Sequence, residues 1–282
     1  MIEEAVAGLG GGWRVSRKLA GGCNQGAYLV RGPGGELAVL KCYAKDADRI
    51  AAAAPVIRAA REHGWPTPAW LATGTTRSGA AWVLQEFAAG QPPRRLDDRV
   101  AALMVEVLEV QAGLGTLAGP GWSQWAWGTV FEDWDGIRAA VRAGFPRGGE
   151  IVAAVDSIAS SCDAAPLSAA DLVHGNFEAG NTLVDGNRLW VVDAQGVSGG
   201  SRAYDLIEAI MVGAALGPAA RAGLARLWAY AQTLPLRDLA VCAGSVGLTF
   251  AESFIRHDGL AEAPAAVPGL LDVLDRARSM IG

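Results

Sequence analysis

The chain has 282 residues, which allows one large domain or two lobes of ordinary size. Hydrophobic residues make up 51% of it, which is ample for a buried core. Its net charge of −5 disfavours a nucleic-acid-binding protein, because such a protein needs a basic face to neutralise phosphates. The same charge is compatible with a small cationic substrate.

The sequence also disfavours a zinc site, a disulfide framework and a membrane partner. The cysteines are scattered, with no C-x-x-C spacing and no paired histidine, at Cys23, Cys42, Cys162 and Cys242. The acidic start, Met1 to Glu4, lacks the pattern of a signal peptide. The longest apolar stretch, at about 207–216, is too short to span a bilayer. We therefore expect a soluble cytoplasmic protein, whose oligomeric state the sequence does not specify.

The first part of the chain is typical of strands. Residues 27–31 and 36–41 flank a Gly-Pro-Gly-Gly turn, which predicts a hairpin. The glycine-rich stretch 21–26 before it can bring backbone N–H groups close to a phosphate, or can be an ordinary turn. Lys41 ends an apolar strand, where it can reach phosphates beneath that turn or protect a sheet edge. Together the two features favour a phosphate site.

A helix is predicted at 46–63, with Asp46 or Asp48 at its start, Gly64 after its end and a kink or a new segment at Pro55. An extended run at 69–71 and a strand at 80–87 follow. The glycine- and proline-rich stretch 88–93 is typical of a linker. We therefore divide the chain into an N-terminal lobe, 1–90, and a C-terminal lobe, 91–282.

The second part begins with an amphipathic helix at 96–117. The next stretch, 120–134, is rich in tryptophan, with acidic residues interleaved. Its aromatic side chains either pack a helical subdomain or line a pocket for a cationic or ring-shaped ligand. The pocket interpretation gives a substrate role to Trp125, Trp127 and Trp134.

After a predicted helix at 151–161, two short apolar runs surround a polar loop that holds His174, Gly175, Asn176 and Asn181. The second run ends at Asp193. In phosphoryl-transfer enzymes, an Asp and an Asn five residues apart position the acceptor and a magnesium ion, and a later Asp holds the metal. Further helices are predicted from 205, at 219–232, 237–256 and 270–280, with a loop at 261–268.

Several short motifs between Gly21 and about Leu206 form a recognisable set. They are Gly21-Gly22-Cys23-Asn24 with Tyr28, Val39-Leu40-Lys41, Leu84-Gln85-Glu86-Phe87 ahead of Gly90-Gln91-Pro92, His174-Gly175-Asn176 through Asn181, Val192-Asp193 and Tyr204-Asp205-Leu206. This set resembles the aminoglycoside phosphotransferase and choline kinase-like family. The resemblance implies an α+β, two-lobed protein kinase-like fold, with an antiparallel sheet in the N-terminal lobe and a mostly helical C-terminal lobe.

The resemblance further implies transfer of a phosphoryl group from ATP or GTP, with Mg²⁺, to a hydroxyl of a small aminated molecule such as an antibiotic or a sugar. Gly21, Gly22, Asn24 and Lys41 would bind the nucleotide phosphates, and the backbone of Gln85, Glu86 and Phe87 would pair with the base. Asn181 and Asp193 would hold the metal. Glu178 would meet a cationic substrate, and Glu252 and Asp258 would add to the pocket walls.

The sequence departs from the family at two places. Asn176 stands where the family has the catalytic Asp, and an amide cannot take the proton of an acceptor hydroxyl. The helix at 46–63 has no evident Glu to pair with Lys41, which leaves Asp46 or Asp48 as substitutes.

Three hypotheses follow from the asparagine. The first is a small-molecule kinase in which Asn176 is natural or a deliberate replacement of Asp. The second is a pseudokinase that binds a nucleotide or a small ligand without transferring phosphate. The third is different chemistry at His174 or Glu178, although a structural histidine and a substrate-facing glutamate are the preferred interpretations of these two residues.

Overall fold

The structure is a computed structural model that describes residues 1–19, 26–257 and 259–282. Its N-terminal part is a five-stranded antiparallel sheet with the strand order β1-β2-β3-β5-β4. The strands are β1 (Arg14–Lys18), β2 (Ala27–Arg31), β3 (Leu37–Tyr43), β4 (Trp70–Thr75) and β5 (Ala81–Glu86). As the sequence predicted, β2 and β3 pair as a hairpin, and their register places Ala27 opposite Lys41.

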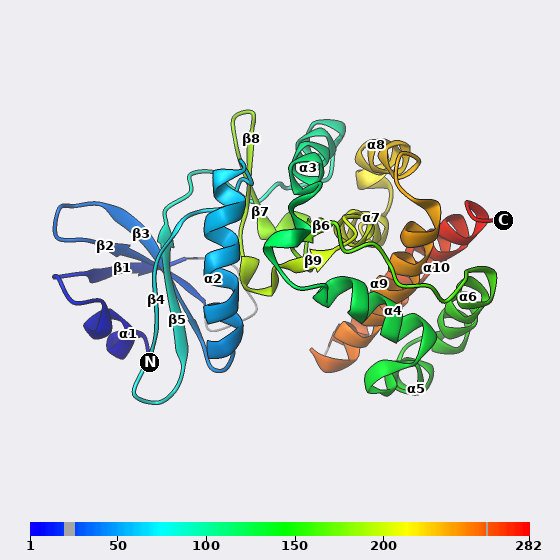
Figure 1. Ribbon diagram of the computed structural model, residues 1–282, viewed down its shortest axis with the longest axis horizontal. Helices are drawn as coiled ribbons and strands as arrows, with labels where there is room; N and C mark the ends of the chain where they lie inside the picture. The colour runs from blue at the N-terminus through cyan, green and yellow to red at the C-terminus, as the bar shows by residue number, and fades with distance from the viewer. Residues whose placement is uncertain (20–25, 258) are drawn as a thin grey trace.

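One helix covers each face of this sheet (Figure 1). Helix α1 (Ile2–Leu9), which the sequence analysis did not predict, packs on a face that includes Leu40. Helix α2 (Ala47–Glu62) packs on the opposite face and stands between the sheet and the rest of the protein (Figure 1). Because side chains alternate along a strand, Lys41 and Tyr43 face the same side as α2.

The segment between β5 and the next helix runs beside a second pair of strands. Gln91 and Val184 exchange backbone hydrogen bonds of 3.2 and 2.8 Å, and Gly90 lies against Val184. The predicted division into lobes at residue 90 falls within this segment and stays a prediction.

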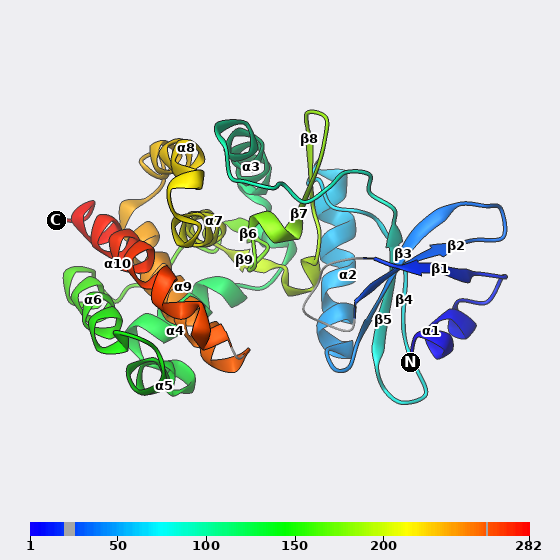
Figure 2. The same cartoon turned by 180° about the vertical axis from the view of Figure 1, so that it is seen from behind.

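The C-terminal part is mostly helical and is built around α9, which contacts α4, α5, α6, α7 and α10 (Figures 1 and 2). The helices are α3 (Asp98–Gln111), α4 (Gly121–Phe131), α5 (Ile137–Gly144), α6 (Gly148–Ser161), α7 (Ala203–Ala215), α8 (Arg221–Ala231), α9 (Leu236–Arg256) and α10 (Ala263–Ser279). Short 3-10 turns lie between them: η1 (Leu114–Leu117), η2 (Trp134–Gly136), η3 (Ala179–Asn181), η4 (Ala194–Gly196), η5 (Gly217–Ala220) and η6 (Gly259–Ala261).

Some helix predictions were wrong in extent. The predicted loop at 261–268 belongs mainly to α10, because Pro264 lies in its first turn, where a proline sacrifices no hydrogen bond. The predicted helix at 96–117 breaks at Ala112 and continues as η1. Pro55 lies inside α2 and does not divide it.

Helix α9 also qualifies the sequence-based statement about membranes. Among the described residues, it is the one helix whose length and composition would allow it to cross a bilayer. However, 67% of its apolar stretch is buried inside the protein, as in the core helix of a globular fold. This feature is therefore weak evidence for a membrane span.

Two small antiparallel pairs lie where the sheet part meets the helices (Figure 1). The first joins β6 (Asp171–Val173) to β9 (Ser198–Gly200), and the second is the hairpin of β7 (Thr182–Asp185) and β8 (Arg188–Val191). These strands hold the polar loop that contains Asn176 and Asn181.

Candidate active site

The polar loop, residues 174–181, connects β6 to the β7–β8 hairpin. The hairpin turns tightly at Gly186 and Asn187, which brings the end of β8 back beside the start of β7. The backbone N–H of Val192 then donates to Asn181 O at 2.9 Å. Asn181 and Asp193, which are far apart along the chain, therefore become neighbours.

Asp205, in the first turn of α7, accepts hydrogen bonds from the loop backbone. One carboxylate oxygen accepts a hydrogen bond from His174 N at 2.8 Å, and the other accepts from Gly175 N at 2.9 Å. Gln111 Nε2 also donates to Asp205 at 2.8 Å, so this buried carboxylate has three donors. Burial raises the pKa of Asp205, and His174 and these donors oppose the rise.

His174 is buried and structural. Its Nε2 lies 2.9 Å from Val192 O, and Asn176 N donates to its Nδ1 at 3.2 Å. Since a carbonyl oxygen only accepts, both contacts fit the neutral ring with its proton on Nε2. Burial lowers the pKa of His174 and keeps this form. A chemical role for His174 thus has no support in its surroundings.

Asn176 is exposed at the tip of the loop, while Asn181 Nδ2 donates to Asn176 O at 2.9 Å. This bond fixes the orientation of the Asn181 amide and leaves its side-chain oxygen available to another partner.

Lys41 of β3 extends from the sheet to Asp193. Its Nζ lies 2.5 Å from Asp193 Oδ1, and the two side chains are 13% and 29% exposed. Tyr43, two residues further along β3, donates to Gln195 Oε1 at 3.5 Å. Burial, followed by the negative charge of Asp193, raises the pKa of Tyr43 above its usual range.

Neither Asp46 nor Asp48 pairs with Lys41, because Asp193 takes that position. Asp46 precedes α2 in a left-handed conformation without a side-chain capping bond. From the first turn of α2 the exposed side chain of Arg49 instead reaches Gly196, where a Cβ would lie 2.6 Å from its guanidinium.

Asp193 itself has a left-handed backbone, with φ of 66°. Such a conformation is uncommon outside glycine and is found at functional sites more often than elsewhere. Asn181 and Asp193 together offer one amide and one carboxylate oxygen, the oxygen ligands that Mg²⁺ accepts beside substrate phosphates and water. The two residues therefore fit a magnesium ion.

The predicted nucleotide residues are only partly visible. Gly21, Gly22 and Asn24 lie outside the described residues. Gln85 is buried in β5, and Glu86 N–H already donates to Ala69 O at 2.8 Å. The Glu86 side chain pairs with Arg61 at 3.4 Å, whereas Phe87 is 39% exposed just beyond the sheet. The Glu86 N–H is therefore not available to a nucleotide base, and backbone groups that could pair with a base lie after it.

The tryptophans of 120–134 have differing surroundings. Trp127 donates to Ala164 O at 2.9 Å, and Trp134 is exposed and donates to Glu132 at 2.9 Å. Trp125 is half-buried against the main core. Among these tryptophans, Trp122 lies against the loop at Gly175, and its indole Nε1 donates to Gly196 O at 2.8 Å. No sequence pattern distinguishes Trp122 from its neighbouring tryptophans.

Glu178 lies in the loop, and its carboxylate folds back toward Gly180. Burial raises the pKa of Glu178, and a hydrogen bond from the Gly180 backbone partly opposes this rise. Glu252 pairs with Arg256 at 2.5 Å, and Asp258 lies outside the described residues. The substrate roles of these residues stay predictions.

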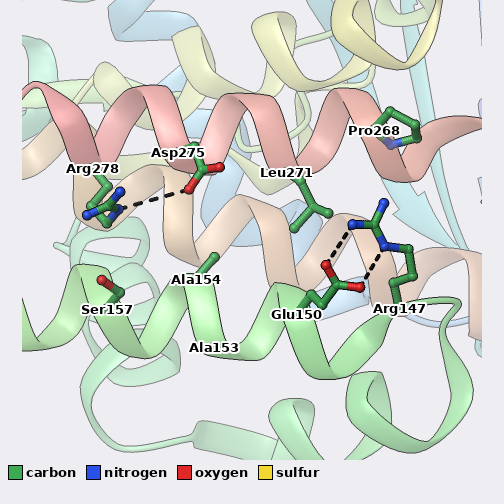
Figure 3. A pocket seen from close by; sticks show the side chains of 9 residues that line it. All are labelled: Arg147, Glu150, Ala153, Ala154, Ser157, Pro268, Leu271, Asp275 and Arg278. Carbon is green, nitrogen blue, oxygen red and sulfur yellow. Dashed lines mark hydrogen bonds and ion pairs between the residues drawn. The ribbon is translucent and has the colours of Figure 1, made fainter.

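A groove of about 580 Å³ lies elsewhere, between α6 and α10 (Figure 3). Two ion pairs, Arg147 with Glu150 and Arg278 with Asp275, border it. Both helices lie on the side of the protein away from the β7–β8 hairpin (Figures 1 and 2). The groove is therefore separate from the candidate active site.

A family model and several solved structures match this chain. The model of the phosphotransferase enzyme family matches residues 15–244. The solved structure of aminoglycoside phosphotransferase APH(4)-Ia has a TM-score of 0.68 at 17% identity, covering 98% of each chain. A choline/ethanolamine kinase family protein from Mesorhizobium loti has a TM-score of 0.60 at 18% identity, covering 97% of this chain and 98% of that one.

Two further structures contain ligands. Amicoumacin kinase in complex with AMP-PNP, Ca²⁺ and its substrate has a TM-score of 0.61 at 10% identity, covering 93% of this chain and 90% of that one. A mutant of APH(4)-Ia in complex with ADP and hygromycin B has a TM-score of 0.66 at 17% identity. The match covers 93% of this chain and 94% of that one. No curated protein matches the sequence. The predicted α+β, kinase-like fold is confirmed.

Proposed function

Because this chain belongs to the phosphotransferase enzyme family, we propose that it transfers the terminal phosphoryl group of ATP to a hydroxyl of a small molecule. One arrangement carries the proposal. Lys41 from the sheet meets Asp193, and Asp193 lies beside Asn181. A lysine and two oxygen-bearing side chains at one point supply what a metal-bound triphosphate requires.

Each residue has a distinct proposed role. Lys41 binds phosphate oxygens as a positive charge, and Asn181 and Asp193 hold the metal. The bound Mg²⁺ would neutralise charge on the phosphates. Asn176 faces the acceptor and can orient its hydroxyl through a hydrogen bond. Positioning and electrostatics dominate phosphoryl transfer, so an amide at position 176 is compatible with catalysis.

The proposed acceptor is a hydroxylated, aminated molecule. Hygromycin B and amicoumacin, which the structural relatives bind, have this character and make suitable first probes. Glu178 supports the proposal because, among the described residues, the partner of its carboxylate is the Gly180 backbone and not a cationic side chain. It would therefore be free to meet an amine. GTP is the alternative phosphoryl donor.

The test measures nucleotide binding and phosphoryl transfer separately. Titration calorimetry with ATP and Mg²⁺ reports binding, and release of labelled phosphate or formation of labelled product reports transfer. We expect binding that requires Mg²⁺, and turnover with at least one aminated acceptor. If ATP and GTP both fail to bind in the presence of Mg²⁺, the proposal is wrong.

The substitution at Asn176 favours one alternative function, a pseudokinase that binds a nucleotide without using it. It predicts that ATP at one hundred times its dissociation constant stabilises the protein by about 2.7 kcal/mol. It also predicts that neither the natural protein nor Asn176→Asp transfers phosphate. Turnover by either protein would exclude this alternative.

A further inference from the structure

Glu208 of α7 contacts the loop directly after Asn176. Its Oε2 accepts a hydrogen bond from Phe177 N at 2.7 Å. Because residues three apart lie on the same face of a helix, Glu208 stands one turn beyond Asp205 and serves the same loop. The two carboxylates of α7 thus accept from three N–H groups of the loop, those of residues 174, 175 and 177.

The second oxygen of Glu208 is available to another molecule. Among the described residues, this oxygen has no hydrogen-bond partner. It is not fully buried, because the described polar atoms that are both buried and unpaired do not include it. The residue is half-buried, whereas Asp205 is fully buried. Glu208 therefore combines one anchored oxygen with one accessible oxygen, beside the loop residue that should face the acceptor.

We propose that Glu208 is a further catalytic residue, which supplies the carboxylate that the loop lacks at position 176. One oxygen holds the loop through Phe177 N–H, and the other accepts the proton of the acceptor hydroxyl. This inference rests on the proposed phosphotransferase function. Asn176 then orients the hydroxyl without titrating, and the two roles of the usual aspartate are divided between neighbours.

The step is balanced without a further reactant. The acceptor oxygen forms a bond to the terminal phosphorus of ATP while the bond between that phosphorus and the bridging oxygen breaks. The electron pair of the broken bond leaves with ADP. The hydroxyl proton moves to the Glu208 carboxylate and from there to water.

The surroundings of Glu208 agree with a proton acceptor. Burial, followed by the neighbouring carboxylate of Asp205, raises the pKa of Glu208 well above its ordinary value. A carboxylate is a more effective base when its pKa is nearer the working pH. Glu178 is the competing candidate, but its carboxylate folds toward Gly180, whose backbone donates a hydrogen bond to it.

The experiment compares Glu208→Gln with the natural protein and with Asn176→Asp/Glu208→Gln. Glutamine keeps an oxygen for Phe177 N–H and removes the proton acceptor. Glu106→Gln, an exposed change on α3, is the matched control, and Glu178→Gln tests the competing carboxylate. Calorimetry first measures binding of ATP with Mg²⁺ to every variant. Turnover is then measured with water, hygromycin B and amicoumacin as acceptors.

We expect Glu208→Gln to bind ATP normally and to lose roughly 10²–10⁴-fold in kcat. Asn176→Asp should restore much of this loss in the double variant, because an aspartate at 176 supplies a new acceptor for the proton. Glu106→Gln should leave kcat unchanged.

The outcomes separate this inference from the function on which it rests. If the natural protein does not bind ATP, the proposed function fails and the inference falls with it. If it binds ATP but transfers phosphate to none of the acceptors, the pseudokinase alternative holds and the inference falls with the proposed function. If the natural protein shows turnover and Glu208→Gln keeps full kcat, the proposed function stands and the role of Glu208 is wrong. A loss that appears only in Glu178→Gln would also overturn it.

Discussion

Lys41 Nζ and Asp193 Oδ1 lie 2.5 Å apart and join the sheet part of the protein to the end of the β7–β8 hairpin. Helix α2 provides no carboxylate for Lys41, so Asp193 is its charged partner in the structure. In the proposed function, Lys41 binds phosphate and Asp193 holds the cation. Nucleotide binding would then replace this ion pair with those two contacts.

Replacement of Lys41 should weaken nucleotide binding. In Lys41→Ala the phosphates lose their positive partner, while Asp193 keeps a negative charge near them. We expect the dissociation constant for ATP with Mg²⁺ to rise at least about tenfold, a change of about 1.4 kcal/mol. Titration calorimetry measures it, and Lys45→Ala, an exposed change on the same segment, is the control. Equal affinity in both variants would contradict a phosphate role for Lys41.

Removal of the Asp205 carboxylate should destabilise the whole protein. Asp205→Ala leaves the N–H groups of His174 and Gly175 and the amide of Gln111 without their acceptor. A buried donor without a partner costs about 1–3 kcal/mol, so we expect a loss of about 3 kcal/mol or more in the free energy of unfolding. Urea denaturation measures this loss.

Asp98→Ala is the matched control for Asp205→Ala. Asp98 pairs with Arg226 on the exposed surface, where ion pairs contribute little to stability. A loss in Asp98→Ala as large as that in Asp205→Ala would show that the buried bonds to the loop are not the cause.

Much of the site could be predicted because its signals are local. The sequence places Lys41 at the end of a predicted strand, Asn181 in the polar loop and Asp193 at the end of the apolar run that follows. In the structure, Asn181 then lies beside Asp193. The family resemblance then supplied the fold, which the comparisons confirm.

The unpredicted contacts depend on tertiary packing. Glu208 lies 31 residues from Phe177 and Trp122 lies 74 residues from Gly196, and no periodic pattern links either pair. Helix α5 was not predicted, and the start of α10 was predicted as a loop. Both helices pack against α9, and this tertiary contact is not evident from the local sequence.

Acidification should weaken the fold through His174. Burial lowers its pKa, so the unfolded chain binds its proton more readily than the native protein does. The neutral ring therefore contributes stability above the unfolded pKa of about 6.5, and this contribution is lost as the pH falls toward the native pKa. Protonation of Nδ1 would also remove the acceptor of Asn176 N.

The free energy of unfolding of the natural protein, minus that of His174→Gln, isolates this effect between pH 5 and pH 8. We expect the difference to be largest at pH 8 and to decrease below about pH 6.5, by about 1.4 kcal/mol for each unit by which the pKa is lowered. A difference that stays constant over this range would mean that His174 has the same pKa in the native and unfolded states.

Gly175 should tolerate no side chain, because its backbone conformation and a neighbouring ring both exclude one. Its φ is +77°, and an added Cβ would lie 1.8 Å from the indole of Trp122. That ring cannot easily move, since its Nε1 donates to Gly196 O and it packs at a tilt against Tyr204, with ring centroids 4.8 Å apart. Gly186→Ala separates the two causes, because Gly186 has φ of +54° with no atom within 4 Å of its Cβ position.

We expect Gly186→Ala to cost about 1–2 kcal/mol for the left-handed backbone alone, and Gly175→Ala to cost about 1–3 kcal/mol more from the clash. Urea denaturation of both variants measures the difference, and equal losses would show that Trp122 moves aside without cost.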